Sequence, residues 1–159
     1  MAATRGTDEL RRAGIDHRLF EYRYGSAAAA GGAAEEAAEL LGIERQRMFK
    51  SLVAAAGDEL VFALVAAGDA LSLKKLAAAA GQKSARMAAP ADAERATGYQ
   101  LGGISPLGSR RRLRVFLDET ATGFPRICLN AGGRGLIVEL EVAQLVAHTG
   151  AVTTDLRQL

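Results

Sequence analysis

The strongest pattern of apolar positions spans residues 48–68, MFKSLVAAAGDELVFALVAAG, in which two apolar runs flank Gly57-Asp58. Two runs of strand length around a Gly-Asp pair predict an antiparallel β-hairpin. Shorter apolar or alternating runs predict single strands elsewhere, and the sequence NAGG predicts a turn between two of them. These further strands are expected over residues 17–24, 112–119, 126–131, 134–141 and 151–156.

Several stretches whose apolar residues recur with the spacing of a helix end in glycine. Glycine is the residue that most readily adopts the left-handed conformation that closes a helix. Thr7 and Ser72 are expected to cap two of these helices, and Pro90 suits the first turn of another. The alanine- and glycine-rich residues 25–34 are typical of a loop that leads into a helix. The helices are expected over residues 7–15, 33–42, 71–81, 89–98 and 142–150.

Strands paired by hairpins and interrupted by helices predict an α/β fold with a mixed, partly antiparallel sheet. The 159 residues are expected to form a single domain over residues 1–159, with 49% apolar and 24% charged residues, a balance typical of globular proteins. The net charge of +2 does not indicate a nucleic-acid partner by itself. Local basic clusters such as SRRRLR matter more for a polyanionic partner than the total charge.

Several classes of site are excluded or disfavoured by composition. The lone cysteine, Cys128, permits no intrachain disulfide and no cysteine-rich metal site, and mid-strand it is typical of a small buried residue. His17 and His148 lie far apart in sequence, which disfavours a metal site or a catalytic triad. No apolar run approaches the roughly 20 residues of a membrane span, so a cytoplasmic protein without a membrane partner is expected.

Lys50 is the first candidate for chemistry. The pleat of a strand places it on the same face as Leu52 and Ala54, at the start of a strand that ought to be largely buried. A desolvated lysine either pairs with an anion or lowers its pKa, and both serve a functional site. The alternative is a lysine whose stem covers the core while its ammonium reaches water.

The first glycine loop, residues 101–108 with the sequence LGGISPLG, resembles a nucleophile elbow without matching it. Leu107 stands where the second glycine of G-x-S-x-G belongs, and Pro106 lacks the backbone N–H that an oxyanion hole needs. Ser105 is therefore disfavoured as a nucleophile. The exposed backbone of the glycines could hold an oxygen of a ligand, or the loop could be a sharp structural turn.

A basic segment follows this loop, and a second glycine loop occurs later in the chain. Arg110, Arg111, Arg112 and Arg114 could contact phosphates or could be a solvated strand edge. The second glycine loop, residues 130–135 with the sequence NAGGRG, could face the first if their strands are neighbours.

Three motifs in this order resemble the YbaK/ProX family of aminoacyl-tRNA editing domains. They are Phe49-Lys50-Ser51-Leu52, then Thr97-Gly98-Tyr99 followed by the first glycine loop, then Ala131 to Leu136. The similarity extends over nearly the whole chain. It implies a mixed, largely antiparallel, barrel-like sheet with surrounding helices.

The resemblance also implies a function and a site. The activity is trans-editing: hydrolysis of the ester that joins a wrong amino acid to tRNA, most often cysteine or alanine on proline tRNA. The implied partners are the aminoacylated tRNA acceptor end and prolyl-tRNA synthetase, with no metal and no cofactor. Activity depends on Lys50, and the substrate's own thiol or a water molecule attacks in place of an enzyme nucleophile.

The resemblance assigns further residues to the site. The residues expected to bind substrate are Tyr22, Ser51, Gly102, Gly103, Ile104, Ser105, Pro106, Asn130, Gly132 and Gly133. The residues expected to contact tRNA are Arg110, Arg111, Arg112 and Arg134.

Two pocket positions depart from the family pattern. Asn130 stands where a serine is expected, and Ile137 where an acidic residue is expected. These departures leave open which amino acid is removed. They also motivate an alternative, a non-catalytic module that binds tRNA or prolyl-tRNA synthetase. A serine hydrolase ranks third.

Overall fold

The computed structural model describes residues 3–25 and 32–159, and within them eight strands form two sheets that are not closed. The three-stranded sheet has the order β1 (His17–Glu21), β7 (Leu136–Glu141), β6 (Arg126–Asn130). The five-stranded sheet has the order β4 (Ala85–Met87), β2 (Phe49–Ala56), β3 (Glu59–Ala66), β5 (Arg114–Asp118), β8 (Val152–Thr154). All neighbours are antiparallel except β3–β5 and β5–β8, which are parallel. The expected mixed α/β fold is confirmed, with its strands divided between two open sheets.

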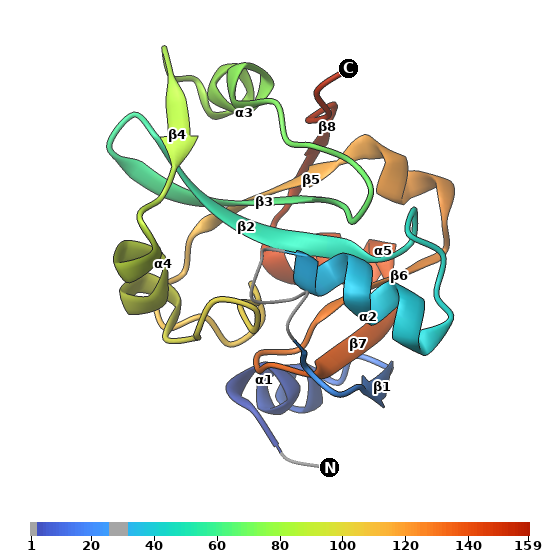
Figure 1. Cartoon of the computed structure of the whole chain (residues 1–159). Helices are drawn as coiled ribbons and strands as arrows, with labels where there is room; N and C mark the ends of the chain where they lie inside the picture. The colour runs from blue at the N-terminus through green and yellow to red at the C-terminus, as the bar shows by residue number, and fades with distance from the viewer. Residues whose placement is uncertain (1–2, 26–31) are drawn as a thin grey trace.

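The predicted hairpin is β2 and β3, paired from Phe49 opposite Ala66 to Ala56 opposite Glu59. The turn contains Gly57 at φ +59°, a conformation that glycine adopts without steric cost. The hairpin is the centre of the five-stranded sheet, and Figure 1 shows it crossing the molecule between α3 and α2. Lys50 lies near the start of β2, and its side chain is partly buried.

Each α-helix ends on a left-handed glycine, as the sequence predicts. One cap differs: Thr4, not Thr7, begins the first helix, because the two threonines form a reciprocal capping box. Ser72 caps the third helix as expected, and residues 26–31 of the predicted loop lie outside the described residues. The helices are α1 (Arg5–Ala13), α2 (Ala33–Leu41), α3 (Leu73–Ala80), α4 (Pro90–Thr97) and α5 (Val142–Thr149).

Three apolar clusters hold the two sheets and the helices together. Phe49 and Val53 pack into the main cluster together with residues of β5, β6 and β7. Ala54 faces a second cluster with α3, so the predicted alternation along β2 is confirmed. A third cluster seats α2 against β6 and β7. Of the helices in the described ranges, none has both the length and the apolar character of a membrane span.

The residues just before β2 join the two sheets. Met48 bridges Cys128 of β6, and the Cys128 N–H donates to the Arg47 carbonyl over 2.9 Å. The Arg47 guanidinium reaches Glu139 of β7 with an Nη1–Oε2 distance of 2.7 Å, and both side chains are mostly buried. These contacts fix where β2 begins, and therefore where Lys50 lies.

Candidate active site

A cavity of about 420 Å³ opens at the start of β2. Six segments that are distant in sequence line it: residues 22–24, the first turn of α2, residues 48–52, Ala67 just after β3, the first glycine loop, and the second glycine loop with the start of β7. Its wall is mainly apolar, with Met48, Phe49, Ala67 and Ile137 buried beside it. A mainly apolar concavity with few polar groups is the usual form of a small-molecule or substrate site.

Lys50 and Ser51 are the polar groups that β2 brings to this cavity. Among the described residues, the Lys50 ammonium forms no ion pair and no hydrogen bond, although the side chain is partly buried. The Ser51 hydroxyl is buried and has no hydrogen-bond partner there either. An unpaired buried hydroxyl is unfavourable by about 1–3 kcal/mol, so both groups are available to a bound molecule.

The two glycine loops contact each other beside the cavity, although β5, which follows the first loop, and β6 and β7, which flank the second, belong to different sheets and are not neighbours. Asn130 joins them: its Oδ1 accepts the N–H groups of Gly132 and Gly133 at 2.6 and 2.9 Å, and its Nδ2 donates to the Gly102 carbonyl at 3.3 Å. Gly103 lies directly against the backbone of Gly133. Most of the hydrogen-bonding capacity of Asn130 is used within the protein.

The expected substrate-binding residues divide into two groups. Those that line the cavity are Tyr22, Ser51, Gly102, Ile104 and Asn130. Those that do not line it are Gly103, Ser105, Pro106, Gly132 and Gly133.

Ser105 belongs to the interior of the first glycine loop. It is fully buried, and its Oγ accepts the Leu107 N–H over 3.1 Å. Tyr99 also supports the loop, since its hydroxyl donates to the Leu107 carbonyl over 2.7 Å. Ser105 thus stabilises the turn and does not face the cavity.

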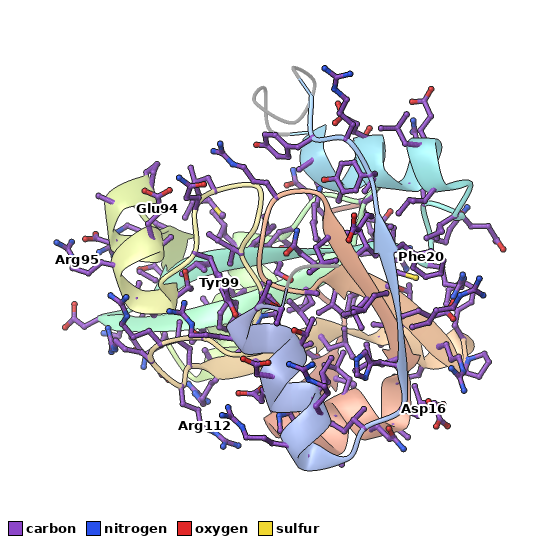
Figure 2. The ribbon with its side chains drawn as sticks, turned by 90° about the horizontal axis from the view of Figure 1, so that it is seen from below. Asp16, Phe20, Glu94, Arg95, Tyr99 and Arg112 are labelled. Atoms are coloured by element: carbon purple, nitrogen blue, oxygen red, sulfur yellow. The ribbon has the colours of Figure 1, made fainter. Side chains whose placement is uncertain are left out.

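The expected tRNA-binding arginines lie on two different parts of the surface. Arg134 lines the cavity at its mouth. The backbone N–H groups of Arg110 and Arg111 donate to carbonyls at the end of α4. Arg112 borders a second cavity of about 110 Å³ beside His148. In Figure 2, Arg112 lies at the lower edge of the molecule and α2, in cyan, at the upper edge.

Tyr24 and Leu101 are cavity residues that the sequence analysis did not identify. Tyr24 is two positions after Tyr22, and side chains two apart share a face of an extended segment, so this spacing was a usable signal. Burial, with the nearby Glu36 carboxylate, raises the pKa of Tyr22 and keeps its phenol neutral. Leu101 is 42% exposed and carried no sequence signal of its own.

Other reactive side chains are engaged away from the cavity. Burial raises the pKa of the Cys128 thiol to about 11, so little thiolate forms at neutral pH. His148 Nε2 lies 2.9 Å from a carboxylate oxygen of Glu9, and His17 Nδ1 lies 2.8 Å from the Ile15 carbonyl. In the described ranges, no three His, Cys, Asp or Glu side chains cluster in a way that could hold a metal ion.

Two proteins of known name share sequence with this chain over more than 100 residues. A protein of Enterococcus faecalis (strain ATCC 700802 / V583) named "Putative Cys-tRNA(Pro)/Cys-tRNA(Cys) deacylase EbsC" is 40% identical over 118 residues, which are 73% of this chain and 71% of that protein. A proline–tRNA ligase of Limosilactobacillus fermentum (strain NBRC 3956 / LMG 18251) is 31% identical over 106 residues, 64% of this chain and 18% of the ligase.

The fold has a close counterpart among solved structures, and the sequence matches a family model. The crystal structure of "a putative trans-editing enzyme for prolyl tRNA synthetase" superposes with a TM-score of 0.85 at 26% identity, over 100% of both chains. The model of the aminoacyl-tRNA editing domain matches residues 29–147, which include Lys50, both glycine loops and most of the cavity wall. The chain therefore belongs to the family of aminoacyl-tRNA editing domains, as its three motifs indicate.

Proposed function

We propose that this protein hydrolyses the ester of a mischarged proline tRNA, Cys-tRNA(Pro) or Ala-tRNA(Pro), and that Lys50 is its catalytic residue. The observation that carries the proposal is Lys50, which lines the cavity of an editing-domain chain and whose ammonium has no partner among the described residues. The beginning of β2 is held by both sheets, which gives the backbone that carries Lys50 a defined position.

The reaction needs charge stabilisation more than it needs an enzyme nucleophile. When water attacks the ester carbonyl, negative charge develops on the carbonyl oxygen, and a cation placed beside it in a water-poor cavity lowers the barrier. The acyl C–O bond then breaks, water supplies the new hydroxyl of the amino acid, and the ribose oxygen takes a proton. The Ser51 hydroxyl is a second group available to the substrate, while Ser105 and Cys128 do not line the cavity.

The apolar wall supports a small, uncharged side chain on the substrate. Met48, Ala67 and Ile137 form part of this wall, and none of them can pair with a charged side chain. Cysteine and alanine meet this condition, because neither carries a charge that would have to be desolvated. The name of the Enterococcus faecalis relative, which refers to Cys-tRNA(Pro) and Cys-tRNA(Cys), supports cysteine.

The proposed nucleic-acid partner is the acceptor end of tRNA. Arg134, which lines the cavity, is proposed to contact the terminal nucleotide, and the exposed Arg110, Arg111 and Arg112 are proposed to contact phosphates farther along the acceptor stem. Prolyl-tRNA synthetase is the proposed protein partner. The name of the matching crystal structure and the matching segment of a proline–tRNA ligase support it.

The test is a panel of proline tRNAs charged with cysteine, alanine, serine or proline, each incubated with the wild-type protein. The proposal predicts rapid loss of the cysteine or alanine ester and a stable prolyl ester. The alternative, a non-catalytic tRNA-binding module, is motivated by Ile137, which puts an apolar side chain where the family pattern has an acid. Binding of tRNA or of prolyl-tRNA synthetase without turnover of any ester would favour that alternative.

A further inference from the structure

Three side chains meet at the mouth of the cavity. The Arg134 guanidinium lies over the Tyr24 ring, with its Cζ 4.8 Å from the ring centroid, and its Nε donates to the Leu101 carbonyl over 3.0 Å. All three residues line the cavity, and Arg134 and Leu101 are exposed, which places them at the entrance. We propose that Tyr24, Arg134 and Leu101 form a stacking site for the terminal nucleobase of tRNA, a subsite that rests on the proposed function.

The segment that carries Tyr24 is held on both sides of the tyrosine. Tyr24 lies against Gly102, where a Cβ would come within 2.3 Å of the tyrosine oxygen, so a larger residue there would displace the ring. The Tyr22 N–H bonds to the Gly135 carbonyl over 2.9 Å, and the Gly25 N–H bonds to a Glu36 carboxylate oxygen over 2.8 Å. The stacking surface is therefore largely preformed, which reduces the entropy lost when a base binds.

The chemistry of this surface fits a nucleobase. Bases stack on aromatic rings and on planar guanidinium groups, and every base offers a flat face for this contact. Within the described residues the Arg134 guanidinium has no acidic partner, so its charge is available to the polyanion that carries the base. Leu101 adds an exposed apolar side chain at the same place.

The position of the surface relative to Lys50 fits the substrate. In an aminoacyl-tRNA the amino acid is esterified to the ribose that bears the last base, so one nucleoside separates the scissile ester from that base. When the ester lies beside Lys50, the base must lie within one nucleoside of it. Tyr24, Arg134 and Lys50 line one and the same cavity, which meets this requirement.

The experiment compares two uncharged hairpin RNAs by fluorescence anisotropy, one ending in CCA and one whose last nucleotide is abasic. We expect the wild-type protein to bind the complete end about tenfold more tightly. The ratio of the two dissociation constants, abasic over complete, should fall to about one in Tyr24→Leu and Arg134→Gln. Tyr24→Phe should keep the wild-type ratio because the ring remains. Arg18→Gln is the matched control, since Arg18 lies over Phe20 at 4.9 Å without lining the cavity.

The outcomes separate this inference from the proposed function, because no ester is hydrolysed in the assay. A wild-type ratio near one overturns the stacking site, and so does a tenfold ratio that persists in folded Tyr24→Leu and Arg134→Gln. Circular dichroism and urea unfolding verify that these variants fold. A tenfold ratio lost in both variants supports the site, even where the panel of charged tRNAs shows no deacylation and the proposed function fails.

Discussion

The two glycine loops meet at Gly103 with no room for a side chain. A Cβ at this position would lie 2.7 Å from Arg134 N, 2.7 Å from Gly133 C and 2.9 Å from Gly133 Cα. All three are backbone atoms, so no side chain can rotate away, and Gly103 itself is buried. We predict that Gly103→Ala forces the loops apart.

The size of the effect follows from the contact. Gly103 is not among the glycines with positive φ, so alanine brings no backbone strain, and the steric overlap alone decides the result. Overfilling a packed site typically costs about 1–3 kcal/mol of unfolding free energy. For a chain of this size that corresponds to a melting temperature lower by roughly 2–4 °C per kcal/mol.

Urea unfolding followed by circular dichroism measures this effect, with Gly123→Ala as the matched control. No heavy atom lies within 4 Å of a Cβ built at Gly123, so alanine there should be neutral or stabilise by up to about 1 kcal/mol. Because Arg134 lies against Gly103, the KM for charged tRNA should also rise in Gly103→Ala. Equal urea midpoints for Gly103→Ala and the wild type would refute the close approach of the loops.

Three further predictions test individual side chains. Ser105→Ala should keep the deacylation rate within about twofold of wild type and lower the unfolding free energy by about 1–2 kcal/mol, because the hydrogen bond from the Leu107 N–H is lost. Abolished deacylation would instead indicate that Ser105 is a nucleophile. Cys128, with its pKa raised to about 11, should resist iodoacetamide at pH 8 until urea unfolds the protein, whereas fast alkylation of folded protein would contradict its burial. Hydrogen bonds from Arg114 hold the pKa of Glu59 below its ordinary value of 4.5. The small stabilisation of the folded state that they provide is therefore present above pH 4.5 and is lost as the pH falls through the pKa of Glu59 in the folded protein. Glu59→Gln should therefore lower the urea midpoint slightly at pH 7 but not at pH 2, and an equal loss at both would contradict the ion pair.

The elements that the sequence predicted well are those with local determinants. The β2–β3 hairpin follows from a Gly-Asp pair between two apolar runs, and each helix end follows from one glycine. The cap of α1 was misplaced because Thr4 and Thr7 bond reciprocally, so either could serve by residue type alone. β4 was missed because its three residues include no β-branched or aromatic side chain, whereas the equally short β8 consists of a valine and two threonines.

The cavity could be predicted only in part, because distant segments assemble it. The motifs around Lys50 and the glycine loops predicted which segments to consider, and all three do line the cavity. The contact of Arg134 with Tyr24 joins residues 110 positions apart, and no local pattern encodes it. The cross-link by Asn130 likewise joins segments that are distant in sequence, since its Nδ2 reaches the Gly102 carbonyl 28 positions earlier in the chain.

Single-turnover deacylation of Cys-tRNA(Pro) by Lys50→Ala tests the central claim most directly. Lys74, an exposed lysine of α3 that does not line the cavity, provides the control Lys74→Ala. We expect a rate at least about 100-fold below wild type for Lys50→Ala, the range seen when a group that stabilises an oxyanion is removed, with an unchanged urea midpoint. Lys74→Ala should keep the wild-type rate. A Lys50→Ala protein that clears the ester as fast as the wild type would show that Lys50 is not the catalytic residue.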